Sequence, residues 1–227
     1  MRSKKNNKLV ISCDGGAASG KTTGAKLISK KYRLKFLSSG ILYRYAAYLL
    51  INNESKNKFL YLKKKFKNIN LKKIEKLKLH DQKISMYTSE IAKIKKIRDI
   101  LKSFQVSFAR KNNRCIIEGR DISTKIIPNA DVKFFFTCDL ANASKRRFKE
   151  LKKNNPNITL SEVKKSIKMR NIKDKKRKHS PLLKVRDALE IQTGKMSIKE
   201  MVIKMSKHID IKVKRKYGNW TTKKTKR

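Results

Sequence analysis

The sequence predicts an α/β fold in which helices flank a central, mainly parallel sheet. Short apolar runs rich in β-favouring residues alternate along the chain with longer segments of helical pattern. The first apolar run ends in an Asp-Gly-Gly turn, and a helical segment follows it at once. Because strands joined by crossover helices pair in parallel, this alternation favours a mainly parallel sheet.

Each expected element rests on a local pattern. Apolar runs bounded by turn residues predict strands at residues 9–13, 35–37, 114–117, 132–137 and 189–192. Helical patterns predict helices at residues 22–31, 41–51, 89–110, 141–153, 161–178 and 197–208. The Lys- and Asn-rich composition of residues 52–87 leaves two alternatives open: a small inserted subdomain or two charged helices.

Length and composition limit the domain organisation. A chain of 227 residues with 38% apolar residues can bury one sizeable core but is short for two independent domains. We expect one domain over residues 1–211, with an insertion near 52–88, a short lid near 153–181 and a basic tail at 212–227. No run of about eighteen apolar residues occurs, and residues 1–8 are polar and basic, so we expect a cytoplasmic protein without a membrane segment.

The formal charge of +45 has two interpretations. Lys and Arg give sequence-independent affinity for phosphates, which would suit a basic RNA-binding protein. Lys, Asn and Ile are also what AT-rich codons encode, so the charge can be compositional. RNA-binding signatures such as RRM aromatics and zinc knuckles are missing, so we expect that nucleic acid is not required. The three widely spaced cysteines predict neither a disulfide nor a zinc site.

A phosphate-binding loop is the strongest local signal. Residues 15–22 read Gly-Gly-Ala-Ala-Ser-Gly-Lys-Thr, a complete G-x-x-x-x-G-K-[ST] match between an expected strand and an expected helix. Small residues let backbone N–H groups converge on phosphates at a helix N-terminus. Lys21 can reach the outer phosphates of ATP, and the hydroxyl of Thr22 or Thr23 can ligate Mg²⁺. The expected ATP-binding residues are Gly15, Gly16, Ala17, Ala18, Ser19, Gly20, Lys21, Thr22 and Thr23.

This loop alone does not separate a GTPase, a motor ATPase and a small-molecule kinase. The Asp-x-x-Gly and Asn-Lys-x-Asp motifs of guanine-nucleotide switches do not follow it. A long apolar strand ending in Asp-Glu, typical of motor ATPases, is also missing. A small-molecule kinase therefore remains as the favoured class.

Five motifs in order, the phosphate loop first among them, resemble the bacterial cytidylate kinase family over about residues 9–205. Residues 14–23 are similar to its D-G-P-[AS]-x-[AS]-G-K-x-T, residues 39–44 (S-G-I-L-Y-R) to its S-G-x-x-Y-R, and residues 89–98 to its S-x-[VI]-A-x-[FI]-x-x-[VI]-R. Gly119, Arg120 and Asp121 with Pro128 resemble G-R-D-x-G-T-x-[VI]-x-P. The last motif, R-x-x-x-D-x-x-R-x-x-x-P, is matched by Arg170, Asp174, Arg177 and Pro181.

The resemblance implies a P-loop kinase that transfers the γ-phosphoryl group of ATP to CMP or dCMP in pyrimidine metabolism, and we expect a monomer. It implies that the CMP phosphate is held by Ser39, Arg44 and Arg120, and that cytosine is held by Ser89, Arg98 and Asp121. It further implies that Arg170, Asp174 and Arg177 close over the transferring group and the ribose. The expected catalytic residues are Lys21, Arg170 and Arg177. Physical chemistry agrees, because phosphoryl transfer needs positive charge that guanidinium forks supply bidentately.

The sequence departs from the family pattern at several positions. Gly16 replaces the usual Pro, Ser38 stands where an Asp is common, and Ser123 stands where the family has Gly. Gln192 replaces an Asp near the adenine side, and residues 52–88 form a shorter segment than the usual nucleotide-binding insertion. These departures bear on affinity and on the shape of the monophosphate subdomain more than on the reaction.

Other interpretations stay open at this stage. Another P-loop kinase, acting on AMP, UMP, shikimate or dephospho-CoA, is the main alternative, and the combination of Ser89, Arg98 and Asp121 argues against it. Whether Arg146 and Arg147 reach phosphates is also undecided. Tyr43 is expected to lie in the core and outside the site.

Overall fold

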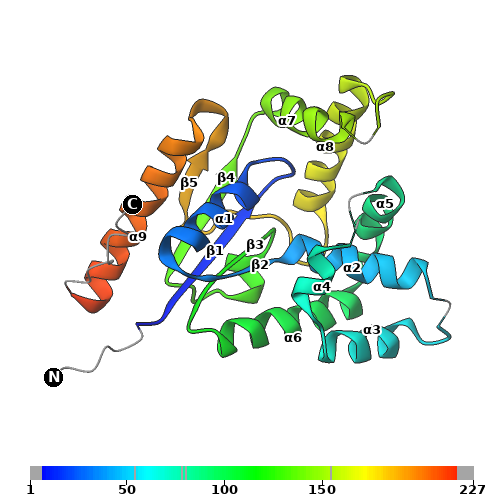
Figure 1. Cartoon of the computed structure of the whole chain (residues 1–227), viewed down its shortest axis with the longest axis horizontal. Helices are drawn as coiled ribbons and strands as arrows, with labels where there is room; N and C mark the ends of the chain where they lie inside the picture. Colours follow the sequence, from blue (N-terminus) through cyan, green and yellow to red (C-terminus); the bar gives the residue numbers. More distant parts are fainter. Residues whose placement is uncertain (1–6, 54, 78, 80, 154, 219–227) are drawn as a thin grey trace.

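The computed structural model describes residues 7–53, 55–77, 79, 81–153 and 155–218. Within these residues, five parallel strands form one sheet in the order β2-β3-β1-β4-β5 (Figure 1). The strands are β1 (Leu9–Gly15), β2 (Lys35–Ser38), β3 (Arg114–Gly119), β4 (Val132–Thr137) and β5 (Leu189–Gln192). All five expected strands are present, and the predicted α/β fold is confirmed.

The central strand β1 brings its carboxyl end next to those of its two neighbours. It pairs in parallel with β3, where Asp14 lies opposite Gly119, and with β4, where Gly15 lies opposite Phe136. Because all strands run in one direction, the loops that follow them meet at a single edge of the sheet. The phosphate loop and the Gly119-Arg120-Asp121 motif are therefore neighbours.

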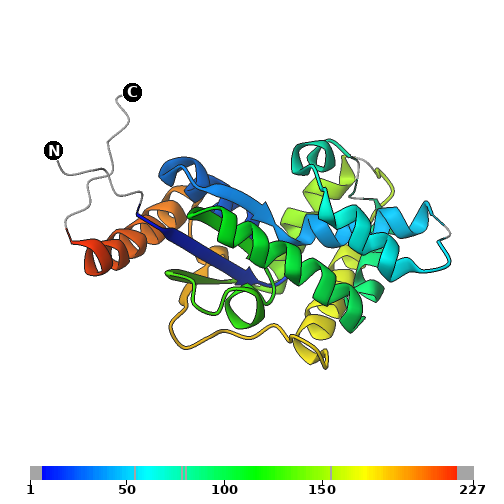
Figure 2. The same cartoon turned by 90° about the horizontal axis from the view of Figure 1, so that it is seen from below.

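Helices cover both faces of the sheet. One core cluster joins β1 and β4 to α1 (Lys21–Tyr32) and α9 (Ile198–Tyr217), with Ile28 and Met205 fully buried. The other face packs against α2 (Ser39–Ile51) and α6 (Lys95–Lys111), through Leu42 and Leu101 among others. Figures 1 and 2 show this three-layered core, with α7 (Leu140–Lys152) and α8 (Leu160–Lys176) beyond the carboxyl edge of the sheet.

Residues 52–87, for which the composition left two alternatives open, are largely helical in their described part. Its elements are α3 (Lys58–Lys67), α4 (Leu71–Glu75) and the start of α5 (Gln82–Ile91), and residues 54, 78 and 80 lie outside the described part. Apolar side chains such as Leu62 and Ile74 join the α2 and α6 core. The segment thus packs as a small helical insertion on one end of the domain.

The prediction of a single helix over residues 89–110 is wrong. Helix α5 ends at Ile91, and α6 begins at Lys95 after a turn in which Ile94 is extended. The Arg98 guanidinium donates a hydrogen bond from Nη1 to the Ala92 carbonyl at 3.0 Å, which satisfies a backbone group that the break leaves open. A contact between residues six apart, which helical periodicity does not register, therefore stabilises the break.

Two other elements differ from expectation. Helix α9 continues past His208 to Tyr217, so the first six residues of the 212–227 segment are helical, and residues 219–227 lie outside the described part. A π-helical turn, η1 (Ile122–Ile126), follows β3 where no regular element was expected. Its backbone is held by Asp14, as described below.

The three cysteines are far apart in the sequence. Cys13, Cys115 and Cys138 are all free thiols, and burial raises the pKa of Cys13 and Cys115. Among the described residues, no helix combines the length and the apolar character that crossing a membrane would require.

Candidate active site

The phosphate loop joins β1 to α1 in the position that the motif predicts. Gly15 lies so close to β4 that an added Cβ would be 2.5 Å from the Phe136 carbonyl oxygen. Gly20 has φ of +78°, a left-handed conformation that favours glycine, and directly precedes the first residue of α1. These two glycines are needed for different reasons, close packing at one end of the loop and backbone conformation at the other.

Lys21 lies at the centre of the candidate site. Its Nζ donates a hydrogen bond to the Gly16 carbonyl at 3.1 Å and lies 3.9 Å from a Glu118 carboxylate oxygen. Burial, followed by the positive charges of Arg120 and Arg170, lowers the pKa of Lys21 to about 7, although Glu118 acts in the opposite direction. A bound anion would stabilise the protonated form of Lys21, so it would raise the pKa of this lysine and restore its full positive charge.

Arginines from four different parts of the chain add positive charge to this site, and two of them, Arg120 and Arg170, act directly on Lys21. Arg44 is on α2, Arg120 follows β3, Arg147 is on α7 and Arg170 is on α8. Burial and the neighbouring charges, chiefly Arg120, lower the pKa of Arg170 to about 9. Burial and the charges of Arg147 and Arg120 likewise lower the pKa of Arg44 to about 10. Cations that destabilise one another in this way form a site for a multiply charged anion.

Asp174 is the carboxylate that balances part of this charge. It accepts a hydrogen bond from Arg120 Nε at 2.7 Å, and Arg177 Nη1 lies 3.4 Å from its other oxygen. Burial alone would raise the pKa of Asp174, but the charges of Arg120, Arg170 and Arg177 outweigh it and lower the pKa. The structure therefore brings Arg120 of one predicted motif together with Asp174, Arg170 and Arg177 of another, about fifty residues further along the sequence.

A second, buried ion pair lies between α6 and the residue after Arg120. Arg98 Nη2 donates to the Asp121 carboxylate at 2.5 Å, and both side chains are almost fully buried. The Arg98 guanidinium also lies over the Tyr43 ring, 5.6 Å from its centroid. Tyr43, which sequence reasoning assigned to the core, is buried as expected but faces this pair. Its place directly before Arg44 in the S-G-x-x-Y-R motif was the available signal.

Not every predicted residue joins these two groups. Ser89 lies on α5, where its hydroxyl donates to the Ser85 carbonyl at 3.3 Å, and no hydrogen bond links it to Arg98 or Asp121 within the described chain. Arg44 Nη1 donates to the Leu79 carbonyl at 3.0 Å and the Ser85 hydroxyl at 2.7 Å. Arg44 therefore fastens the helical insertion to α2 as well as adding charge to the site.

Ser39 and the neighbouring Ser38 lie where β2 passes into α2. A Cβ at Gly119 would lie 3.0 Å from the Ser39 Cβ, so the two motifs are in contact. Ser38, the residue that departs from the common Asp, caps α2 by accepting from the Ile41 N–H at 3.4 Å. Its hydroxyl donates to Glu118, which places a longer acidic side chain opposite the shorter Ser38.

Asp14 is a positioning residue that the sequence analysis included in the phosphate-loop motif without giving it a role. Its fully buried carboxylate accepts hydrogen bonds from the N–H groups of Ile122 and Ser123, both at 2.8 Å, and from the Ser123 hydroxyl at 2.5 Å. These bonds hold the π-helical turn next to Arg120 and Asp121. They also explain Ser123, because a glycine there would lack the hydroxyl that completes the Asp14 contacts.

Arg146 and Arg147 have different surroundings. Arg146 donates from Nη1 to the Thr193 hydroxyl at 2.9 Å and from Nη2 to the Thr193 carbonyl at 2.7 Å. The Thr193 hydroxyl in turn donates to the Ser19 carbonyl at 3.0 Å. Arg146 thus supports the phosphate loop from outside, whereas the charge of Arg147 acts on the arginine cluster.

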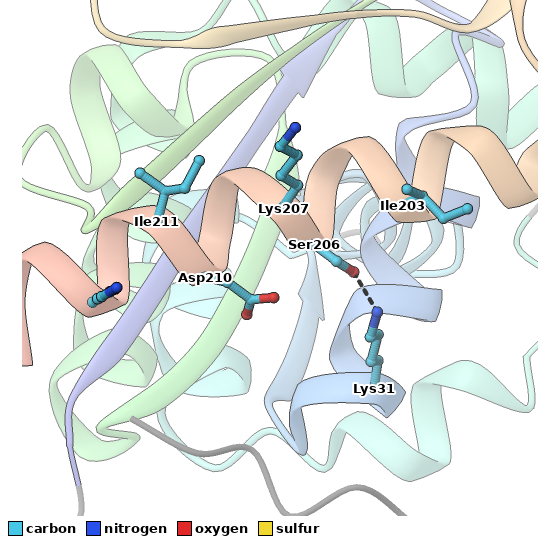
Figure 3. A pocket seen from close by; sticks show the side chains of 7 residues that line it. Lys31, Ile203, Ser206, Lys207, Asp210 and Ile211 are labelled. Atoms are coloured by element: carbon cyan, nitrogen blue, oxygen red, sulfur yellow. Dashed lines mark hydrogen bonds between the residues drawn. The ribbon is translucent and has the colours of Figure 1, made fainter. Parts of the chain in front are cut away.

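A separate shallow groove of about 450 Å³ lies on the outer face of α9 (Figure 3). It is lined by Lys31, Ile203, Ser206, Lys207, Asp210, Ile211 and Lys214. Lys31 Nζ donates to the Ser206 hydroxyl at 2.8 Å across it. None of the residues predicted for nucleotide binding borders this groove, so it is distinct from the candidate active site.

A phosphate loop at the carboxyl edge of a parallel sheet, with the charges of Arg120 and Arg170 beside its lysine, defines a P-loop phosphotransferase with an anionic acceptor. Comparison with known proteins gives the family. The family model described as cytidylate kinase matches residues 11–211, and the chain belongs to this family. Members with that name are phosphotransferases that have a phosphate group as acceptor. The resemblance seen in the motifs is thereby confirmed.

The relatives match over nearly their full length. A cytidylate kinase of Fusobacterium nucleatum is 36% identical, with 89% of this chain and 97% of that protein covered. One of Rickettsia conorii is 35% identical (90% and 93% covered), and one of Clostridioides difficile is 34% identical (89% and 99% covered). A crystal structure of an uncharacterized protein from Eubacterium ventriosum aligns with a TM-score of 0.49 at 16% identity, covering 89% of this chain and 99% of that chain.

Proposed function

We propose that this chain transfers the γ-phosphoryl group of ATP to CMP and dCMP, giving ADP with CDP or dCDP. Its family supports a nucleotide kinase, and the observation that carries the proposal is the placing of the Arg120 and Arg170 charges beside the buried Lys21 of the phosphate loop. A monomer in the cytoplasm that serves pyrimidine metabolism is the setting we propose for this activity.

On the donor side, residues 15–23 cradle the ATP phosphates. The first turn of α1 presents their N–H groups, and Lys21 is poised to regain its charge beside the β- and γ-phosphates. Ser19 Oγ is buried without a hydrogen-bond partner in the described part of the chain, which fits a loop shaped for a ligand with acceptor oxygens.

Mg²⁺ fits the same loop through oxygen donors. Thr22 and Thr23 are exposed at the start of α1, and their hydroxyls are suitable ligands for a hard cation that is held mainly by phosphates and water. Among the described residues, no cluster of three or more His, Cys, Asp or Glu side chains could hold a metal without the nucleotide. When bound, Mg²⁺ would neutralise charge on the phosphates. Thr22 or Thr23 would orient it.

On the acceptor side, we propose that Ser39, Arg44 and Arg120 bind the CMP phosphate. The buried Arg98 and Asp121, with Ser89 at the edge, read the cytosine. Residues 52–88 form the monophosphate-binding insertion, and residues 153–181 form a lid. From this lid, Arg170, Asp174 and Arg177 close over the ribose and the transferring group.

Charge and position account for the proposed catalysis. The transferring phosphoryl group spreads negative charge over its equatorial oxygens, and little covalent chemistry is needed from the protein. Lys21 begins α1, Arg170 lies in α8 and Arg177 caps the end of α8, and all three are buried or half-buried cations that can meet that charge without large rearrangement. Closure of α8 over the loop excludes water, which would otherwise accept the phosphoryl group.

The test is a coupled assay of ADP release with CMP, dCMP, UMP, AMP or no acceptor. We expect fast release with CMP and dCMP, slower release with UMP, and only background release with AMP or without acceptor. Equal or greater activity with AMP would favour another nucleotide kinase. ADP release that needs RNA, or no release with any nucleotide, would overturn the proposal.

A further inference from the structure

One side chain of α8 contacts the phosphate loop directly. Asn171 Oδ1 accepts a hydrogen bond from the Ala17 backbone N–H at 2.9 Å, across 154 positions of sequence. We propose that Asn171 is a positioning residue that fastens the lid helix to the phosphate loop and so sets where Arg170, its neighbour in sequence, lies. This inference rests on the catalytic role proposed above for Arg170.

The absence of a side chain at Gly16 in the phosphate loop leaves space for the Asn171 carboxamide. A Cβ built on Gly16 would lie 3.0 Å from Asn171 Oδ1 and 3.5 Å from both Cγ and Nδ2. All three polar-group atoms therefore lie against the bare backbone of Gly16. A larger residue at position 16 would push against the contact that Asn171 makes with the next residue of the loop. Gly16 and Asn171 thus form a matched pair.

Asn171 belongs to the face of α8 that holds the helix in place. Val163 and Ile167 are buried on that face and pack in a small cluster with Ala17 and Ala143. Asn171 follows Ile167 by four residues, so it continues the same helical face. The face therefore contacts the phosphate loop through apolar groups and through one directional hydrogen bond.

A second polar contact lies one turn further along α8. Asp174 accepts the hydrogen bond of Arg120 Nε at 2.7 Å, so α8 is also fastened to the loop after β3. Arg170 lies between the apolar cluster and these polar contacts. The hydrogen bond of Asn171 restrains both the distance of α8 from the loop and the rotation of the helix about its axis, because hydrogen bonds depend on distance and angle. It therefore orients the Arg170 guanidinium toward Lys21. Apolar packing, which has no preferred direction, does not restrain this orientation.

The strength of the Asn171 hydrogen bond limits how much its loss can lower kcat. A neutral hydrogen bond of this kind is worth roughly 2- to 10-fold in an equilibrium. If the bond sets the position of Arg170 at the moment of transfer, Asn171→Ala should lower kcat by about 3- to 10-fold. KM for CMP should change less than about twofold, because Asn171 is not one of the proposed CMP ligands.

The experiment compares Asn171→Ala with Asn171→Asp and with Ile172→Ala. Asp keeps an acceptor for the Ala17 N–H, so it should restore kcat, while its negative charge raises KM for ATP. Ile172 follows Asn171 in sequence, so it lies about 100° further round α8, where it is 38% exposed, and its variant should behave as the unmodified enzyme. Hydrogen exchange of the Ala17 amide, followed by NMR without nucleotide, should quicken in Asn171→Ala and not in Ile172→Ala.

A double-mutant cycle with Gly16→Ala adds a test that loss of fold would not imitate. Gly16→Ala alone should lower kcat by about as much as Asn171→Ala, because the new Cβ displaces the carboxamide. When both changes are combined, the second should add little. Fully additive losses would overturn the proposed pairing of Gly16 with Asn171.

Parallel measurement of Arg170→Ala separates this inference from the function on which it rests. A normal kcat in Arg170→Ala would overturn the role of Arg170 and this inference together. A slow Arg170→Ala enzyme beside an Asn171→Ala enzyme with normal kcat and unchanged Ala17 exchange would overturn the inference alone. A slow Asn171→Ala enzyme rescued by Asp supports it.

Discussion

Arg120 and Asp174 join the end of β3 to helix α8 through a hydrogen bond of 2.7 Å between Nε and a carboxylate oxygen. Each side chain is only 15% exposed, so the pair is shielded from solvent but not sealed from it. The bond holds together a residue proposed to bind the acceptor phosphate and the helix proposed to close over it. The contact between these two elements therefore holds them in a closed arrangement of the site.

Asp174→Asn should reveal how much of this organisation depends on charge. Because the folded protein lowers the pKa of Asp174, its ionised form contributes stability above about pH 4, the ordinary range for Asp. That contribution is lost as pH falls through the lowered pKa. We expect Asn to cost about 1–3 kcal/mol at pH 7, and the difference from the unmodified protein to shrink below about pH 4. Chemical unfolding at several pH values measures this difference in the free energy of unfolding. A difference that does not change with pH would contradict a stabilising role for the ionised Asp174.

Lys21 should make ATP binding depend on pH. Burial and the charges of Arg120 and Arg170 lower its pKa to about 7, and bound phosphates should raise it. Below pH 7 most of the Lys21 amine is already protonated, so ATP binding takes up only a small fraction of a proton. Above pH 7, binding should take up close to one proton, and affinity should fall by up to about tenfold per pH unit.

Calorimetry at pH 8.5 in two buffers of different ionisation enthalpy measures this proton uptake. ATP phosphates are fully ionised at that pH, so their own titration does not contribute. Lys21→Met keeps an unbranched side chain without the amine and should lose most of the uptake, leaving the smaller part that Arg170, with its pKa lowered to about 9, contributes at this pH. Heats that are independent of the buffer in the unmodified enzyme would contradict the expected pKa of Lys21.

The sequence was sufficient for the sheet and for the phosphate loop. Five apolar runs gave five strands because a buried parallel strand needs a continuous run of such residues, and residues 15–22 carried their own local geometry. The break in the helix after Ile91 could not be predicted from helical periodicity, because it is stabilised by a hydrogen bond from the Arg98 side chain to the Ala92 carbonyl. The π-helical turn depends likewise on Asp14, which is more than a hundred residues away.

The site was predicted by motif and only partly by physics. Lysines are so frequent here that composition cannot mark a cation as functional, and Arg44, Arg147 and Arg170 become neighbours only through the sheet topology. Helical periodicity indicated that Tyr43 is buried, but it could not show that the ring faces Arg98. Burial is encoded locally in the sequence, whereas the partner of a buried group depends on the assembled fold.

Arg177 should act on the rate more than on ATP binding. Its Nη1 faces Asp174 at 3.4 Å, and its Nη2 is buried without a hydrogen-bond partner among the described residues. Such a donor fits an oxygen that arrives with substrate. We expect Arg177→Ala to lower kcat by about 10²- to 10³-fold while the Kd of ATP changes by less than about twofold. Arg177→Lys should recover only part of the rate, since it lacks the planar fork. A change confined to ATP affinity, measured by equilibrium binding, would make Arg177 an ordinary cation.

Asp121 and Arg98 should decide which base is accepted. Cytosine presents a donor at N4 and an acceptor at N3, and a carboxylate facing N4 with a guanidinium facing N3 matches both. The two side chains are bonded to each other at 2.5 Å and nearly fully buried, so they present fixed groups to the base. Uracil reverses the polarity at both positions, which leaves buried polar groups without partners. Sites built on hydrogen bonds can reject such an analogue by up to about 10⁴- to 10⁵-fold.

We expect kcat/KM for CMP to exceed that for UMP by at least about 10-fold, a lower bound that allows for water at the edge of the pocket. The proposed readers do not touch the 2′ position, so dCMP should also be accepted. Asp121→Asn should narrow the ratio mainly by slowing CMP, because an amide can rotate to present a donor or an acceptor. Steady-state kinetics with both nucleotides, with thermal unfolding to confirm the fold of the variant, measures this. Equal use of UMP and CMP by the unmodified enzyme, or an unchanged ratio in Asp121→Asn, would show that another group reads the base.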